Sequence, residues 1–283
     1  MRSFYQPSAV AAVMAIVNRT PDSFYDRGAT AAEAAALARV DEVVAAGAAI
    51  VDIGGVKAGI GTPVSVAEEI DRVVPVIAAT RARYPELHIS VDTWRAEVGA
   101  AAIAAGANLI NDTWAGHDPE LAEVAGAHSV GYVCSHTGGA LPRTNPVRVS
   151  YPDVVADVIA ETECLAQRAV AAGVPENKIL IDPTHDFGKN TYHGLELLRR
   201  CRELVATGWP VLMALSNKDF VGETLGREVE QRVPGTLAAT AHAAAQGVAV
   251  FRAHQVAETV DVCRMVAAIS GEFAPLRPIR GLV

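Results

Sequence analysis

Eight polar residues of types that bind ligands or take part in catalysis each follow a short apolar run of this sequence. They are Asn18, Asp92, Asn111, His136, Asp182, Ser216, Arg252 and His254. Their carboxylate, amide, imidazole, hydroxyl and guanidinium groups can bind phosphate oxygens, a hard cation or a polar heterocycle. The sequence spreads them over most of the chain. The segments between them must therefore form a frame that brings the ends of the runs together.

The apolar runs are typical of buried parallel strands, and the stretches between them are typical of helices. The runs are Val13–Asn18, Ile50–Gly55, His88–Thr93, Leu109–Trp114, Gly131–His136, Ile179–Thr184, Val211–Ser216 and Ala249–His254. Start and stop signals recur between them: Ser65 and Glu68 form a capping-box pattern, and Gly106 and Gly173 end later helices. Eight such units without a break predict an α/β fold, the TIM (β/α)8 barrel, whose strand ends open onto one mouth.

The same pattern sets the expected domain organisation. Residues 1–12 are expected to form a loose arm, and residues 13–283 a single barrel. No GxGxxG motif follows the first run, which argues against a dinucleotide-binding sheet. Thr30 and Glu33 are expected to cap the first helix, which Gly47 ends.

Composition excludes several classes of protein. The 283 residues are 51% hydrophobic with a net charge of −8, which suits a large core and disfavours a nucleic-acid surface. No signal peptide or membrane span is apparent, so we expect a cytoplasmic protein with no membrane partner. The four cysteines lack zinc-site spacing, and we expect Cys134, Cys164 and Cys201 to be small buried residues.

The last run predicts an anion site. It ends with Phe-Arg-Ala-His, so Arg252 and His254 share one side of the strand. In barrels, the region after strands seven and eight commonly binds phosphate, and guanidinium pairs with phosphate oxygens in a bidentate manner. The alternative is an Arg–carboxylate pair at the rim. Asn18 could supply an oxygen ligand to Mg²⁺ bound with a diphosphate, or it could serve only in a turn.

Three further residues predict a site for a flat heterocycle. Asp92, Asn111 and Asp182 end three of the runs, and two acids with one amide suit a ring that carries N–H donors and carbonyl acceptors. Lys218, just beyond the seventh run, could donate to that ring or pack its stem against it. Each residue alone could instead cap a following helix.

Together these segments resemble one family. The loop NRTPDSF, the run ends SVDT, INDT and IDP, the segment DFGK, the SNK after the seventh run and the terminal RAH resemble dihydropteroate synthase, a pterin-binding barrel. The resemblance runs from about residue 13 to 256. It implies an enzyme that joins a dihydropterin methyl diphosphate to p-aminobenzoate, with Mg²⁺ leaving together with the diphosphate.

The resemblance also implies roles for individual residues. Arg252 and His254 would hold the diphosphate, with Asn18 at the metal. The pterin would be read by Asp92, Asn111, Asp182 and Lys218. Asp22, in the first loop, would close the site and stabilise positive charge developing on the reacting carbon. Asp22 and Lys218 are therefore the catalytic candidates.

Departures from the family pattern lie around the second substrate. Where the family has Thr, Arg and Pro in its second loop, this chain has Ala58, Gly59 and Ile60. Asn217 and Asp219 replace residues that offer donors to a carboxylate, and Asp186 replaces a glycine beside the pterin. Two like charges at contact distance cost several kcal/mol at an effective dielectric of ~20, so Asp219 is expected to repel p-aminobenzoate.

These differences leave three hypotheses. The first is a divergent second paralogue of dihydropteroate synthase with weak or absent activity, and with a different substrate as one possibility. The second is an active synthase in folate biosynthesis whose first two loops reorganise on binding. The third is a non-catalytic anion- or pterin-binding protein. A homodimer is expected in each case, because relatives pair through helices of the last third and residues 235–246 are rich in small side chains.

Overall fold

The computed structural model describes residues 10–18, 33–144 and 150–280. Its eight strands are parallel and lie in the order β6-β5-β4-β3-β2-β1-β8-β7. They are β1 Ala12–Asn18, β2 Ile50–Gly54, β3 His88–Asp92, β4 Leu109–Asp112, β5 Gly131–Ser135, β6 Ile179–Asp182, β7 Leu212–Met213 and β8 Val250–Ala253. A parallel bridge between Ile181 and Val211 joins β6 to β7 and closes the ring. The predicted (β/α)8 barrel is confirmed.

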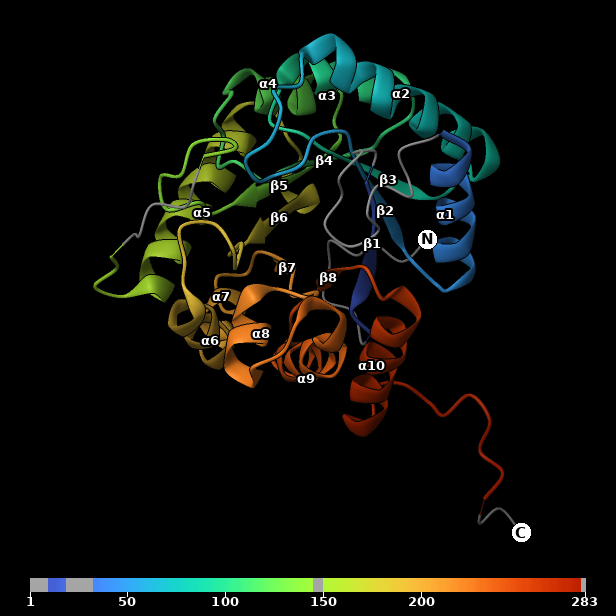
Figure 1. Cartoon of the computed structure of the whole chain (residues 1–283), viewed down its shortest axis with the longest axis vertical. Coiled ribbons are helices and arrows are strands. Elements are labelled where there is room, and N and C mark those ends of the chain that lie inside the picture. Colours follow the sequence, from blue (N-terminus) through green and yellow to red (C-terminus); the bar gives the residue numbers. More distant parts are fainter. Residues whose placement is uncertain (1–9, 19–32, 145–149, 281–283) are drawn as a thin grey trace.

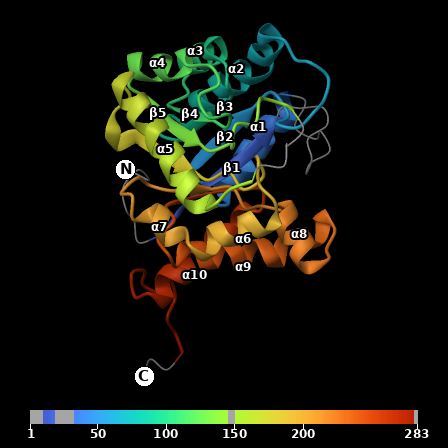
Figure 2. The same ribbon diagram turned by 90° about the vertical axis from the view of Figure 1, so that its left-hand side faces the viewer.

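Helices surround the strands on the outside of the ring, as Figures 1 and 2 show. They are α1 Glu33–Ala45, α2 Val66–Arg83, α3 Ala96–Ala104, α4 Glu120–Ala127, α5 Val154–Ala171, α6 Thr191–Arg199, α7 Cys201–Val205, α8 Asp219–Leu225, α9 Val233–Ala244 and α10 Val256–Ile269. No described helix is long and apolar enough to cross a membrane. Beyond α10, the chain runs away from the barrel (Figure 1).

Several helix ends follow the predicted local signals. The Ser65 hydroxyl caps α2 by accepting a hydrogen bond from the Glu68 amide at 3.2 Å. Gly106 and Gly173 follow α3 and α5 with φ of 114° and 96°, a left-handed conformation that glycine adopts without steric cost. Thr30, the expected cap of α1, lies outside the described residues.

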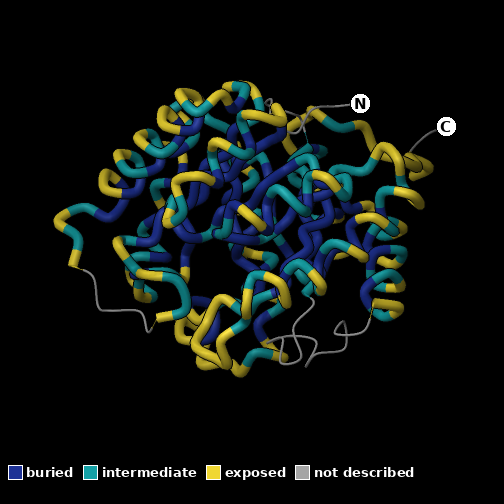
Figure 3. Tube along the Cα trace, turned by 90° about the horizontal axis from the view of Figure 1, so that it is seen from above, coloured by how far each residue is buried: buried dark blue, intermediate teal, exposed yellow. Residues whose placement is uncertain are grey.

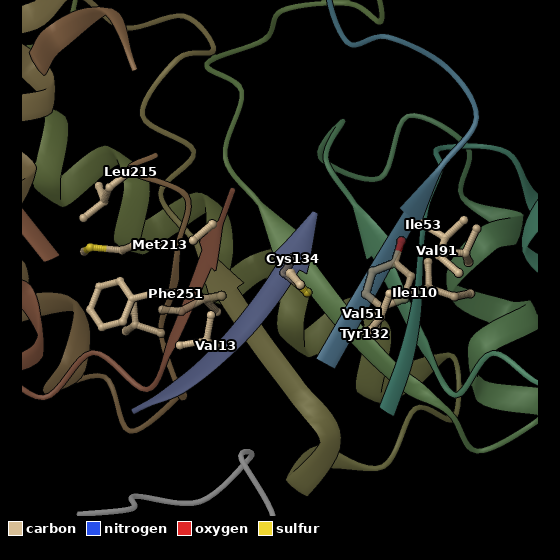
Figure 4. Close-up of a cluster of buried hydrophobic side chains, with 14 of the residues drawn as sticks. Val13, Val51, Ile53, Val91, Ile110, Tyr132, Cys134, Met213, Leu215 and Phe251 are labelled. Carbon is tan, nitrogen blue, oxygen red and sulfur yellow. The ribbon is translucent and has the colours of Figure 1, made fainter. Parts of the chain in front are cut away.

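Alternation along the strands produces two separate apolar layers. Residues pointing out of the barrel pack against the helices, and Figure 4 shows Val13, Val51, Val91 and Phe251 among them. Residues pointing inward form a smaller cluster inside the ring. It comprises Met14, Ile50, Leu109, Val133, Leu180, Leu212 and Val250. Figure 3 shows that buried segments gather in the middle of the molecule and that exposed ones lie mostly around its edge.

The cysteines follow the prediction with one exception. Cys134 in β5 and Cys201 in α7 are buried, but Cys164 on α5 is exposed. The expectation that Cys164 is a small core residue is therefore wrong, because its position in α5 turns toward solvent rather than toward the strands.

Candidate functional site

A polar layer lies next to the inner apolar layer, toward the carboxyl ends of the strands. All of its members but Ser90 come two residues after a residue of the inner apolar cluster, and Ser90 comes two residues after His88, so each points to the inner side of its strand. The layer includes Asp52, Ser90, Asn111, Ser135, Asp182 and Arg252. These inward positions place groups from six strands around the barrel axis.

Arg252 is the centre of this layer. Its Nε donates to Asp52 Oδ2 at 2.6 Å and its Nη2 donates to Asp92 Oδ2 at 2.6 Å. The Asn111 amide also donates to Asp52 Oδ2, at 3.0 Å. Burial raises the pKa of Asp92 to about 7, although the positive charge of Arg252 opposes this rise. The guanidinium thus holds two buried acids from neighbouring strands in one network.

A cavity of about 480 Å³ opens above this network at the mouth of the barrel. Its polar and charged lining residues are Asn18, Lys57, Asp92, Asp186, Ser216, Asn217, Lys218, Asp219, Arg252 and His254. Ala58, Gly59 and Ile60 of the loop after β2 line it as well. Burial lowers the pKa of His254 to about 3, so its imidazole is neutral at ordinary pH.

This cavity unites most of the predicted site. Asn18, Asp92, Ser216, Lys218, Arg252 and His254 all line it. Asn111 and Asp182 are fully buried and do not line it, and burial raises the pKa of Asp182 to about 6. Asp22, the predicted loop catalyst, lies outside the described residues.

His136 was expected at the same mouth, and that expectation is wrong. Its Nε2 lies 2.8 Å from Asp157 Oδ1 and 3.1 Å from Glu161 Oε2, both on α5. Lys189 Nζ lies 2.7 Å from its Nδ1. Ser135, not His136, is in register with Asp182 on β6. Because strand residues alternate sides, His136 points outward toward the helix.

His136, Asp157 and Glu161 lie close enough together to hold a metal ion, but hydrogen bonds alone account for their arrangement. Burial lowers the pKa of Lys189 to about 7, and its Nζ keeps N–H donors in either charge state. With Lys189 donating to Nδ1, Nε2 carries the ring proton and faces the two carboxylates. All three groups are then satisfied.

Asp219 has a partner that its sequence position did not reveal. Arg232 Nη1 donates to Asp219 Oδ1 at 2.8 Å and to the Asn217 carbonyl at 2.9 Å. The nearby positive charge weakens the repulsion that Asp219 was expected to exert on a carboxylate ligand. Lys218 likewise forms an ion pair, with Asp186.

Asn18 and Asp92 face each other across Gly54. The register pairs Gly54 with Asn18 on one side and with Asp92 on the other. A Cβ built on Gly54 would lie 3.4 Å from Asp92 Cβ and 3.7 Å from Asn18 Oδ1. The absence of that carbon leaves space beside the Asn18 amide oxygen, next to the Asp92 carboxylate that Arg252 holds, and an amide oxygen is a ligand that suits Mg²⁺.

Asp52 is the functional candidate that sequence reasoning missed. It is completely buried and bonds Arg252 and Asn111. The available signal was the strand period: Asp52 comes two residues after the inward Ile50, so both share one side of β2. A carboxylate inside a barrel requires a cationic partner, which the same rule identifies as Arg252.

A second cavity, of about 410 Å³, lies at the opposite end of the barrel, where Ala11, Val211 and Ala249 precede their strands. Of the titratable side chains described, only Cys263 and Glu272 line it. The cavity at the mouth is therefore the better candidate for polar ligands.

Comparisons with known proteins agree with this geometry. The family model described as pterin binding enzyme matches residues 14–254. A Mycobacterium tuberculosis protein named inactive dihydropteroate synthase 2 is 61% identical over 276 residues, covering 96% of this chain and 87% of its own. The dihydropteroate synthase of Streptococcus pyogenes is 37% identical over 263 residues, covering 92% and 96%.

A solved structure extends the similarity to three dimensions. The Xanthomonas albilineans dihydropteroate synthase with 4-aminobenzoic acid has a TM-score of 0.84 and 40% identity, covering 92% of this chain and 93% of that one. The family match spans nearly the whole barrel, from β1 to the end of β8. The chain therefore belongs to the pterin-binding enzyme family, as a divergent relative of dihydropteroate synthase.

Proposed function

We propose that this protein binds a pterin, or an anionic pterin diphosphate, at the mouth of the barrel and joins it to 4-aminobenzoate weakly or not at all. One observation carries the proposal, namely that the two walls of the cavity differ. One wall keeps the amide, acid, guanidinium and imidazole expected for a pterin diphosphate. The other carries Ala58, Gly59 and Ile60 in place of the Thr, Arg and Pro of the family pattern. The name of the 61%-identical mycobacterial relative supports the same conclusion.

The first wall suits an anion next to a ring. Arg252 lies in β8 and His254 directly follows that strand, where the hydrogen bond from His254 N to Ser216 Oγ at 3.2 Å fixes the backbone. Because its pKa is raised to about 7, Asp92 could donate a hydrogen bond to a ring nitrogen or accept one from a ring N–H near neutral pH. Mg²⁺, if it enters with the diphosphate, would take an oxygen of Asn18 and neutralise phosphate charge.

The second wall lacks groups that hold an aromatic carboxylate. Ile60 is 57% exposed and contributes only apolar surface, while Gly59 contributes only backbone. Arg143 holds this loop by donating to the Thr62 carbonyl at 2.9 Å and to the Gly59 carbonyl at 3.3 Å. An acceptor amine would therefore be poorly oriented for attack, and orientation supplies a large part of the rate of such two-substrate reactions.

Calorimetry and a turnover assay with the full chain test the two parts of this proposal separately. In calorimetry, the dihydropterin methyl diphosphate with Mg²⁺ is expected to bind. In the assay, the same ligand with 4-aminobenzoate is expected to form no dihydropteroate above the rate without protein. The Streptococcus pyogenes synthase serves as the positive control for both.

Each result has a defined meaning. Turnover comparable with the streptococcal enzyme would refute the loss of activity and establish an active synthase. Absence of heat with the pterin diphosphate, with 6-hydroxymethylpterin and with pyrophosphate would refute the binding function.

A further inference from the structure

Lys218 is held by an acid from the neighbouring strand end. Lys218 precedes α8, and its ammonium forms an ion pair with the carboxylate of Asp186, which lies in the loop between β6 and α6. Both residues line the cavity at the mouth. Their side chains remain partly accessible, at 23% and 38%. A ligand entering this cavity therefore meets a lysine whose charge is already paired.

The loop that carries Asp186 is firmly anchored on both sides of it. Lys189 Nζ lies 3.0 Å from each of the Thr184 and Phe187 carbonyl oxygens and 3.2 Å from the His136 carbonyl oxygen, within hydrogen-bonding distance of all three. The Asp182 carboxylate accepts from the Thr184 amide at 2.8 Å. One ammonium and one carboxylate thus fix the backbone immediately before and after Asp186.

Packing restrains the same loop further. The Phe187 ring packs edge-on against Trp114 with centroids 4.4 Å apart. Gly188 has φ of 62°, and its carbonyl accepts from the Tyr151 hydroxyl at 2.9 Å. A Cβ on Gly188 would come within 2.5 Å of the Thr137 carbonyl oxygen, so the backbone approaches closely there. Asp186 is therefore presented to Lys218 by a rigid turn rather than by a loose loop.

Asp219 provides a contrast within the same cavity. It is also an acid on the lining, but its partner is Arg232 at 2.8 Å. Of the two carboxylates, Asp186 is the one that engages Lys218. Each would repel an anionic ligand by its charge, whereas Asp186 would additionally compete for the lysine.

We propose that Asp186 is a specificity-determining residue that occupies Lys218 and so lowers the affinity of this cavity for a pterin ring. The inference rests on the proposed pterin-binding function and deepens it. A ring carbonyl must compete with the Asp186 carboxylate for the Lys218 ammonium, and the anchored loop keeps that carboxylate close to the lysine. The cavity consequently favours ligands that do not depend on Lys218.

A double-mutant cycle with 6-hydroxymethylpterin, an uncharged probe, tests this inference by calorimetry. Asp186→Asn is expected to raise the affinity about tenfold, because the amide binds the ammonium more weakly than a carboxylate does. The same change in a Lys218→Met background is expected to give no gain. Asp219→Asn is the matched control, since it removes an equal charge from the same cavity, and it is expected to change the affinity less than about twofold.

The cycle distinguishes the inference from a general charge effect. A gain of equal size in the Lys218→Met background would overturn it, as would a gain with pyrophosphate but none with the pterin. Circular dichroism and the unfolding midpoint of each variant show whether the protein is folded. If the wild type binds the pterin and Asp186→Asn leaves that affinity unchanged, only this inference fails. If neither protein binds any pterin, the inference and the proposed function both fail.

Discussion

At the scale of the residue, burial sets the protonation states of the side chains inside the barrel mouth. Desolvation raises the pKa of Asp92 to about 7 and lowers the pKa of His254 to about 3. Asp92 can therefore be protonated near neutral pH, and His254 stays uncharged even in mild acid. Shifted pKa values of this kind cluster at functional sites, and composition alone does not reveal them.

His185 allows a direct test of the cost of burial. It is buried against Phe220, and neither ring nitrogen has a hydrogen-bond partner among the described residues. Burial lowers its pKa to about 3, from an ordinary value of 6.5. Between these two pH values only the unfolded chain binds the proton, so the folded protein loses stability as pH falls from about 6.5 toward 3. We expect His185→Ile to raise the free energy of unfolding by about 1–3 kcal/mol, with a larger gain at pH 4.5 than at pH 7.5.

Urea unfolding at the two pH values measures this difference. The exposed His128, changed to Gln, is the control and is expected to have little effect. A gain for His185→Ile that does not grow on acidification would show that the imidazole is protonated in the folded protein.

Arg252 permits a second test, of the buried acid pair. Replacing it with Met leaves Asp52 and Asp92 without their cation and is expected to lower the free energy of unfolding by about 3–5 kcal/mol at pH 8. The raised pKa of Asp92 means that acidification neutralises it first, so the loss is expected to shrink at pH 5.5. Denaturant titrations at both pH values check this. An equal loss at both would contradict the assigned charge states.

At the scale of the element, the strand period explains which predictions succeeded. The eight apolar runs coincide with the eight strands to within a few residues. The prediction that the ends of the runs meet at one mouth is confirmed for Asn18, Arg252 and His254, which line the same cavity. The same period assigns Ser135 inward and His136 outward, so the prediction that His136 lies at the mouth is wrong. Contacts between the ends of different helices, such as Arg232 before α9 with Asp219 in α8, have no signal in one sequence.

The loop between β6 and α6 gives a prediction at this scale. Gly188→Ala combines a left-handed φ with a collision against the Thr137 carbonyl. Gly139→Ala has a similar φ of 80°, but a Cβ there meets no described atom within 4 Å. We expect Gly139→Ala to cost about 1–2 kcal/mol and Gly188→Ala at least twice as much. Thermal unfolding of the two variants compares them, and equal losses would mean that the loop is not tightly held.

At the scale of the whole molecule, closure of the barrel is what turns scattered residues into a site. The Ile181–Val211 bridge joins the two ends of the sheet, and the carboxyl-terminal ends of β1, β3 and β8 then border one cavity together with the segments after β2, β6 and β7. Fold and much of the site could be predicted because strand ends in this architecture share a mouth. Homodimer formation remains a prediction, to be checked by sedimentation velocity.

The segment beyond α10 contributes little to this frame. Leu276 and Ile279 are 78% and 72% exposed, whereas Glu272 and Phe273 still bond the Ala267 carbonyl. Removing residues 275–283 is therefore expected to shift the thermal midpoint by less than about 2 °C. A larger loss would show that this segment packs on the barrel or on a second subunit.

The central claim is that a pterin-family cavity persists here without efficient condensation. Release of diphosphate from the dihydropterin methyl diphosphate, with Mg²⁺ and saturating 4-aminobenzoate, tests it most directly. We expect release at the rate of the protein-free reaction, although the ligand binds. Sustained release that depends on 4-aminobenzoate and matches the streptococcal synthase would contradict it.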